Sequence, residues 1–159
     1  MKNFNGQKGF TLIELLVIII IIIILAGISI IALNGQRAKA RDANRISDVK
    51  QIRTALEFYF SDEGEYPAIS QPVVLGKGNA EKLCSKAEGG FVSATTACSQ
   101  ETTYMSKVPT DPLPDRQYTY TGSNDGFDIL FITEKESSLG LAGAYHAHSE
   151  TIDTSSGNR

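Results

Sequence analysis

A long apolar run dominates the N-terminal part of this 159-residue chain. It extends from Phe10 to Leu33 and contains a single carboxylate, Glu14. At 1.5 Å per residue, about 24 helical residues cross a hydrocarbon core of about 30 Å. Ile is a modest helix former in water, but in lipid the backbone must satisfy its own hydrogen bonds, so we expect a helix. Because the run would aggregate in water, we expect it in a membrane or inside an assembly.

After Leu33 the chain becomes polar but keeps a helical period. Apolar residues recur at three- and four-residue steps, as on one face of an amphipathic helix: Ile46, Val49, Ile52, Leu56 and Phe60. The solvated side is expected to carry Asp48, Lys50, Arg53 and Glu57. No proline interrupts residues 10–63, and Gly64 and Pro67 end the periodic segment, so we expect one helix of about 54 residues. We expect the stripe to be core that docks a sheet rather than a second membrane surface.

Period-two alternation, the pattern of half-buried strands, covers two segments of the C-terminal third. These are Gln117–Thr121 and Phe127–Thr133, and the Gly- and Asn-containing segment between them, Gly122–Gly126, is a turn. One face of the second strand collects its apolar residues: Phe127, Ile129 and Phe131. We expect an antiparallel hairpin with a third strand near Ala144–Ala147. Packing of its apolar face on the helical stripe would give an α+β fold.

Two other segments show no clear period. From Ala68 to Tyr104 the chain is rich in Gly, Ser and Thr, and we expect surface loops there. The tail from Thr151 to Arg159 is small and polar, and we expect it to be frayed.

The loop-like segment contains both cysteines of the chain, Cys84 and Cys98. About 14 residues separate them, without a C-x-x-C spacing or a nearby His, which favours a disulfide that closes a surface loop. Two free thiols in a reducing compartment are the alternative. A disulfide would place this domain outside the cytoplasm.

Charge argues against nucleic acid as a direct partner. With 15 Lys and Arg against 18 Asp and Glu, the formal net charge is -3, and no basic stripe is available to neutralise phosphates. The sequence also lacks the motifs of common enzymes, including G-x-S-x-G, H-E-x-x-H and a Walker loop. We therefore expect a structural protein and no enzyme, with a membrane-anchored hydrolase as the enzymatic alternative.

The junction before the apolar run resembles the class III leader of type IV pilins and type II secretion pseudopilins. It consists of Lys8-Gly9-Phe10-Thr11-Leu12-Ile13-Glu14-Leu15-Leu16, and the N-terminal third as a whole resembles that family. The resemblance implies that a prepilin peptidase cuts between Gly9 and Phe10 on the cytoplasmic side and that the new Phe10 amine is methylated. It also implies four parts: a leader (1–9), a transmembrane and assembly helix (10–34), an amphipathic helix (35–64) and a globular pilin-like domain (65–159).

Glu14 is the fifth residue of the implied mature chain. An unpaired carboxylate in hydrocarbon costs several kcal/mol or becomes protonated. In the family that the chain resembles, this acid pairs with the amine of a neighbouring subunit, here Phe10, and guides the subunit into a growing filament. The alternative is an acid that only reaches the cytoplasmic headgroups.

A second resemblance concerns Asp111-Pro112, because the major pseudopilin of type II secretion opens its sheet region with Asp-Pro-Trp-Gly and has a calcium site after it. Here Leu113-Pro114 follows instead of Trp-Gly. The candidates for calcium ligands are Asp111, Asp125 and Asp128, with Asp115 and Asn124 nearby. Turns attract these residue types in any case, so we expect ordinary turn chemistry and no cofactor.

Two histidines, His146 and His148, would point the same way on a strand, a geometry able to hold a metal. Two ligands make a poor metal site. We therefore expect these side chains on a solvated surface.

Together these features predict a structural subunit of a type IV pilus-like helical filament, with a pseudopilin of a type II secretion system as the alternative. The subunit would form a homo-oligomeric filament and would have minor pilins as partners. Its other implied partners are prepilin peptidase, an inner-membrane assembly platform and an assembly ATPase. We expect a single-pass cytoplasmic membrane protein with an extracytoplasmic C-terminal domain, which after assembly stands in an extracellular pilus or a periplasmic or wall-spanning pseudopilus.

Overall fold

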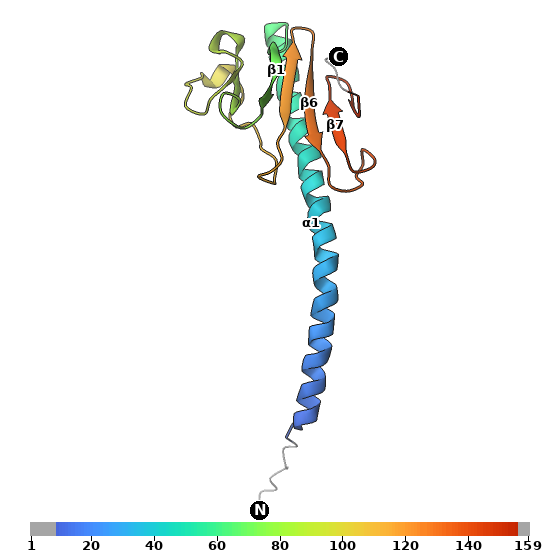
Figure 1. Cartoon of the computed structure of the whole chain (residues 1–159). Coiled ribbons are helices and arrows are strands. Elements are labelled where there is room, and N and C mark those ends of the chain that lie inside the picture. Colours follow the sequence, from blue (N-terminus) through green and yellow to red (C-terminus); the bar gives the residue numbers. More distant parts are fainter. Residues whose placement is uncertain (1–8, 156–159) are drawn as a thin grey trace, which may run out of the picture. The chain divides into compact units, whose positions relative to one another are not determined.

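The computed structural model describes residues 9–155, apart from the side chains of residues 29–32. A single helix, α1 (Leu12–Glu63), comprises 52 residues (Figure 1). The uninterrupted helix predicted from the sequence is confirmed, with a start two residues later than expected. Of the implied leader, residues 1–8 lie outside the described residues. The chain forms two compact units, residues 1–37 (the N-terminal unit) and 38–159 (the C-terminal unit), and each is described by itself.

The apolar helix of the N-terminal unit is exposed along residues 12–28. Its large aliphatic side chains range from 41% exposed at Ile18 to 82% exposed at Leu12. The most apolar window of α1 has a mean hydropathy of 3.5, so the helix is long and apolar enough to cross a membrane. Lipid or other chains must cover this surface, because exposed runs of this kind aggregate in water.

In the C-terminal unit α1 is amphipathic. Four of the predicted stripe positions are buried: Ile46, Val49, Ile52 and Leu56. The prediction for Phe60 is wrong, because this side chain is 38% exposed and stacks on Tyr66, with 4.6 Å between ring centroids. Tyr59 takes the core position instead, since a three-residue step from the preceding stripe residue points it at the sheet. Asp48 and Arg53, expected in solvent, are half-buried.

Five antiparallel strands form the larger sheet, in the order β1-β5-β6-β7-β8 (Figure 1). They are β1 (Ile69–Val74), β5 (Thr119–Ser123), β6 (Gly126–Ile132), β7 (Ala144–Ala147) and β8 (Ile152–Asp153). The predicted hairpin is β5–β6, and Ser123 pairs with Gly126 across a two-residue turn. The predicted third strand is confirmed as β7.

The sheet packs on the buried face of α1, as predicted. Phe127, Ile129 and Phe131 on one face of β6 are all 0% exposed. They belong to the same hydrophobic core as Ile52 and Leu56 of the helix. The α+β architecture predicted from the sequence is therefore confirmed.

The segment predicted to be loops, Ala68 to Tyr104, contains β1 of the larger sheet and nearly all of a second, three-stranded antiparallel sheet in the order β3-β2-β4. Its strands are β2 (Lys82–Cys84), β3 (Phe91–Val92) and β4 (Thr103–Met105), and two short 3-10 helices adjoin them, η1 (Lys86–Glu88) and η2 (Gln100–Thr102). The prediction of loops is wrong for both sheets. Strands of two or three residues are too short to show a period, and in the six-residue β1 exposed and less exposed positions do not alternate. Leu83 and Phe91 anchor this sheet in the core.

The prediction of a frayed tail is wrong for its first part. Ile152 and Asp153 form β8, and they pair with Ala147 and His146 of β7. Residues 156–159 lie outside the described residues. The end of α1 agrees with the prediction: Gly64 has a φ of 76°, a conformation that glycine adopts without strain at helix ends.

Candidate assembly site and charged cluster

The predicted assembly residues lie at the start of α1. Gly9 and Phe10 precede the helix, and Phe10 is 75% exposed. Thr11 caps the helix, because its carbonyl accepts the Leu15 N–H at 3.2 Å and its hydroxyl accepts the Glu14 N–H at 3.3 Å. Glu14 therefore lies in the first turn, where the helix dipole favours a negative charge.

Glu14 thus has two physical explanations. The Thr11-x-x-Glu14 spacing is that of a capping box, in which Glu or Gln at this position supports the helix start. The second explanation is that the Glu14 carboxylate pairs with a positive group of another chain, since the residue is exposed in the structure. Gln would preserve the first role and abolish the second, so the two explanations are separable by experiment.

A second polar constellation, the charged cluster, lies in the C-terminal unit and centres on Arg45. The Arg45 side chain is 0% exposed, and its guanidinium contacts three carboxylates. Nε and Nη2 donate to the two oxygens of Asp111 at 2.7 and 2.8 Å, a bidentate pair. Nη1 donates to Asp42 at 2.7 Å and to Glu134 at 2.6 Å.

Arg41 and the backbone complete the charged cluster. Arg41 donates to both oxygens of Glu134, at 2.7 and 2.6 Å. The Asp42 carboxylate accepts the backbone N–H groups of Glu134 and Lys135 at 2.9 and 2.8 Å. The cluster therefore joins α1 to the segment before β5, through Asp111, and to the β6–β7 loop. Such a buried ionic network fixes geometry more than it adds stability, because its charges lose their hydration.

Hydrogen bonds set the ionisation of this cluster. The fork from Arg41 is the main cause that lowers the pKa of Glu134 to about 2. Hydrogen bonding to Asp111 is the main cause that raises the pKa of Arg45 well above its ordinary value, against the opposing effect of burial. The Arg45–Glu134 pair therefore stays ionised at neutral pH.

The candidates for calcium ligands lie in different surroundings. Asp111 is held by Arg45, and Asp128 lies 2.7 Å from Nδ1 of His146. Asp125 is exposed in the turn between β5 and β6. Two further candidates are also exposed: Asp115 and Asn124. A calcium ion at Asp111 would have to displace a guanidinium, and the expectation of turn chemistry without a cofactor stays a prediction.

The expectation of a solvated histidine pair is wrong for His148, which is 1% exposed. Its Nδ1 lies 3.2 Å from the Phe127 carbonyl oxygen, and its Nε2 lies 3.0 Å from that of Ser155. The rings of His146 and His148 are nearly parallel, with centroids 6.4 Å apart, so they do point the same way. His148 holds the segment after β8 against the sheet.

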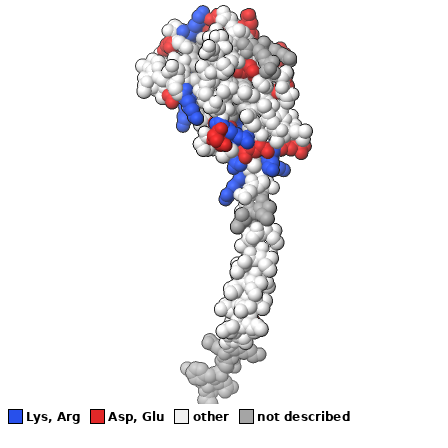
Figure 2. Space-filling view, viewed as in Figure 1, with Lys and Arg blue, Asp and Glu red and all other residues white. Residues whose placement is uncertain are grey.

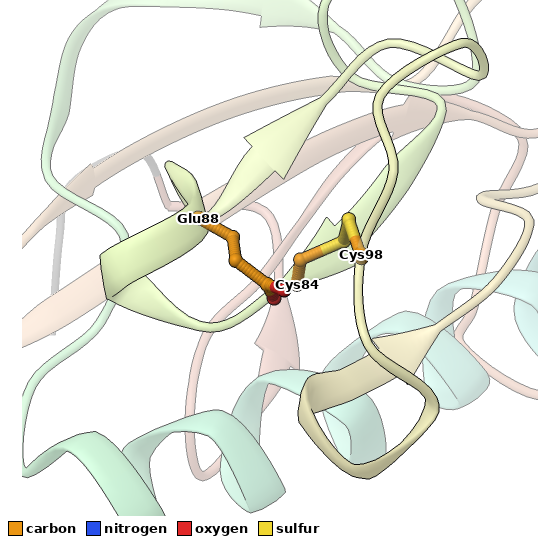
Figure 3. A group of neighbouring side chains, drawn as sticks. All are labelled: Cys84, Glu88 and Cys98. Carbon is orange, nitrogen blue, oxygen red and sulfur yellow. A yellow bond between two sulfur atoms is a disulfide. The ribbon is translucent and has the colours of Figure 1, made fainter.

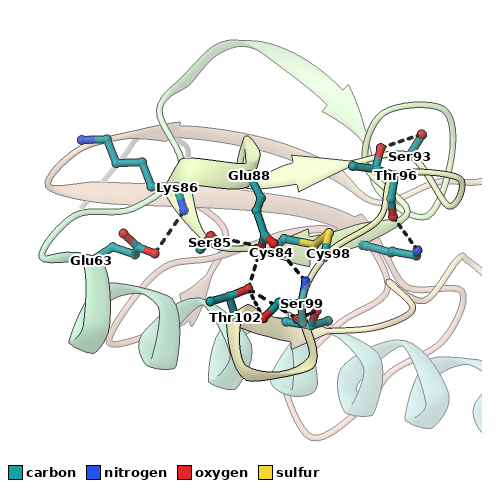
Figure 4. The surroundings of a disulfide bond; sticks show 12 residues. Glu63, Cys84, Ser85, Lys86, Glu88, Ser93, Thr96, Cys98, Ser99 and Thr102 are labelled. Atoms are coloured by element: carbon teal, nitrogen blue, oxygen red, sulfur yellow. Dashed lines mark hydrogen bonds between the residues drawn. A yellow bond between two sulfur atoms is a disulfide. The ribbon is translucent and has the colours of Figure 1, made fainter.

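Cys84 and Cys98 form a disulfide, as predicted, with an S–S distance of 1.99 Å (Figure 3). Beside it the Glu88 carboxylate accepts the Ser99 N–H at 2.9 Å and the Thr102 hydroxyl at 2.8 Å (Figure 4). These bonds, chiefly the one from Ser99, lower the pKa of Glu88. The two sulfurs are bonded to each other, so this group of three side chains offers a metal no free thiolate. The disulfide links β2 to the segment before η2.

Sequence reasoning missed two parts of these sites. The cap at Thr11 has a local signal, the spacing Thr11-x-x-Glu14. The cluster around Arg45 has only a partial one, because Asp42 precedes Arg45 by three helical positions but Glu134 is 89 residues away.

Two protein families match adjacent parts of the chain. Residues 4–30 match the prokaryotic N-terminal methylation motif. Residues 32–146, well over half of the chain, match protein G of the type II secretion system. The first match covers the junction and apolar helix, and the second covers most of the C-terminal unit.

Relatives with the name type II secretion system core protein G align with most of the chain. The protein of Escherichia coli (strain K12) is 29% identical over 131 residues, which cover 82% of this chain and 83% of that protein. The Pseudomonas aeruginosa protein is 30% identical over 124 residues, which cover 77% of this chain and 80% of that protein. No solved structure gives a significant match.

These matches favour the pseudopilin alternative over the first interpretation, a type IV pilus subunit. They also confirm the prediction of a structural subunit rather than an enzyme. The methylation motif and the membrane-length helix together describe a single-pass, membrane-anchored protein with a C-terminal domain. The chain belongs to the protein G family of the type II secretion system.

Proposed function

We propose that this protein is a pseudopilin, a structural subunit of the helical filament of a type II secretion system. The match of residues 32–146 to protein G carries the proposal. A filament subunit needs an apolar surface that other copies cover and a domain that folds around its own core. The described residues provide both, because Ile22 is 57% exposed while Ile52 is fully buried on the same helix.

Processing would precede assembly. A prepilin peptidase cuts between Gly9 and Phe10, and the new Phe10 amine is methylated. A side chain built on Gly9 would meet no atom within 4 Å, so packing in the described chain does not require glycine there. Close approach of an enzyme to the backbone does favour glycine, which supports a scissile position.

Assembly would then pair Glu14 with the Phe10 ammonium of a neighbouring copy. Opposite charges attract strongly where water is excluded, but both lose hydration, so the pair sets the register of the helices more than it adds stability. Exposure of Phe10 and Glu14 in the structure supports this step.

The remaining partners follow from this role: minor pseudopilins, an inner-membrane assembly platform and its ATPase. We place the mature chain across the cytoplasmic membrane with the C-terminal unit on the periplasmic side, because the disulfide needs an oxidising compartment. Direct binding of nucleic acid is not expected at a net charge of -3.

The proposal is tested in the native host by deletion of the gene and complementation. Wild-type chain should restore export of secreted proteins, carry N-methylated Phe10 in mass spectrometry, and appear in a filament fraction. Gly9→Val should block processing and export, whereas Gly35→Ala, at another open glycine, should not. Unimpaired export in the deletion strain, together with loss of surface pili, would reject the proposal in favour of a type IV pilin.

A further inference from the structure

Two exposed features of the C-terminal unit lie at opposite ends of its helix. Phe58 is 61% exposed. Fifteen residues earlier, about 22 Å along α1, Ala43 lies in a groove of about 390 Å³ between the helix and the β6–β7 loop. Ile46 lines the groove from the helix, and Ser137 and Ser138 line it from the loop. Fifteen residues are about four helical turns, so Phe58 and Ala43 share one side of α1.

We propose that Phe58 of one copy of this chain fills the groove of the next copy, in a head-to-tail contact between C-terminal units. The inference rests on the proposed function, because it names the surface through which filament subunits meet. A contact between two different patches is heterologous, so it can repeat along a helix of subunits. A self-complementary patch would stop at a dimer.

Charges along α1 fit a second copy as the occupant. Subunits inserted with the same polarity have parallel helices, and seating Phe58 in the groove requires a fifteen-residue shift between them. A Glu14–Phe10 pair requires a shift of only about four residues, so the next copy in this contact is not the neighbour that Glu14 joins. This shift places Glu57 within about one helical turn of Lys39 of the next copy. It places Asp62 within about one turn of Lys50 of the next copy. All four charged residues are exposed, and each pairing is between opposite charges.

The walls of the groove agree with an apolar occupant. Lys39 and Glu136 line the groove with opposite charges, and the Asp42 carboxylate is engaged by Arg45. Leu141 of the same loop is 76% exposed and would gain cover from the next copy. Figure 2 shows charged side chains along the lower edge of this unit, whereas most of the face in view is uncharged.

One aromatic side chain buries too little surface for a stable complex by itself. In a filament the apolar helices hold neighbouring copies together, which gives the contact a high effective concentration. The full chain in its membrane and filament is therefore the material for the test.

Cysteine cross-linking in cells tests the contact directly. Full-length chain with Phe58→Cys and Ser138→Cys, oxidised after assembly, should give a ladder of dimers, trimers and larger species. The matched control pairs Phe58→Cys with Ser123→Cys, an exposed residue at the end of β5, and should give no ladder. Two results would overturn the proposal that Phe58 fills the groove of the next copy. One is dimers from the single variant Phe58→Cys, and the other is a cross-link from Phe58→Cys to a protein of another mass.

Charge reversal provides an independent test. Asp62→Lys or Lys50→Asp alone should lower the assembled fraction about tenfold, and the double variant should restore it, because the opposite-charge pairing returns. Equal loss in the double variant would overturn the proposed offset. If wild-type chain forms filaments but the assembled Phe58→Cys, Ser138→Cys variant gives no ladder, the interface is overturned and the pseudopilin role stands. If wild-type chain forms no filament at all, both are overturned.

Discussion

The two parts of α1 bury apolar side chains by different means. In the N-terminal unit Ile22 is 57% exposed, and the described residues around it belong to the same exposed helix. In the C-terminal unit Ile52 is 0% exposed beneath the sheet. One helix therefore packs the apolar face of one part against its own domain and leaves the apolar surface of the other part for lipid or for other copies. Folding of the domain and assembly of the filament thus depend on different side chains.

Charged groups show the same contrast. Arg45 is satisfied within its own chain by Asp42, Asp111 and Glu134. Within the described chain, Glu14 lies in the first turn of the apolar helix and its backbone N–H donates to Thr11. The first arrangement holds one domain together, and the second suits a contact with another molecule.

The largest expected effect on folding comes from Arg45→Ala. It leaves Asp42 and Asp111 buried without their cation, which costs about 3–5 kcal/mol of unfolding free energy. Urea unfolding of the full chain in detergent, followed by the near-ultraviolet circular dichroism of its six Tyr, measures this. Lys50→Ala, on the exposed side of the same helix, is the control. Equal stability of the two variants would contradict a structural role of the charged cluster.

A matched pair of substitutions sharpens the comparison between the two parts of the helix. Ile52→Ala should lower the unfolding free energy of the C-terminal unit by about 2–5 kcal/mol, because it opens a cavity in the core. Ile22→Ala makes the same chemical change on exposed surface and should stay within about 0.5 kcal/mol in the same measurement. Similar losses would show that the two parts do not fold independently.

Loss of the disulfide should have a somewhat smaller effect. Replacement of Cys84 and Cys98 by Ser removes a link across 14 positions, which costs about 3 kcal/mol in the chain-entropy model. Limited proteolysis should then cut first between the two positions, within the small sheet. If instead the variant unfolds at the same urea concentration as wild type, the disulfide makes no measurable contribution to the free energy of unfolding.

The smallest effect concerns pH. The pKa of Glu134 is lowered from its ordinary value of 4.5 to about 2, chiefly by Arg41, so its ion pairs stabilise the folded state above pH 4.5. That stabilisation is lost as the pH falls from 4.5 towards 2. Glu134→Gln should reduce the slope of unfolding free energy against pH in this window, and a slope remains because the pKa of Asp153 is also lowered to about 2. Glu150→Gln, the same change at an exposed acid outside the charged cluster, is the matched control.

The parts that could be predicted from the sequence are those with a local signal. The stripe through Ile52, the hairpin around Ser123 and the spacing of Cys84 and Cys98 each depend on neighbours within a few turns or one loop. The charged cluster depends on a contact between Arg45 and a residue 66 positions away, which no period reveals.

The small sheet escaped prediction for a related reason. Its strands have two or three residues, and core contacts such as that of Leu83 stabilise them more than any alternation along the chain. Tyr59 and Phe60 could not be distinguished, because steps of three and four both preserve a helical face. Tertiary packing decided between them.

The central claim is that the charge of Glu14 recruits each subunit into the filament, and Glu14→Gln tests it most directly. Gln keeps the capping box with Thr11 but carries no charge to pair with the Phe10 amine. We predict that Glu14→Gln and Glu14→Ala are both processed and inserted, and that both are absent from the filament fraction. Normal filaments from Glu14→Gln, with loss only in Glu14→Ala, would show that Glu14 merely caps the helix and would contradict the account.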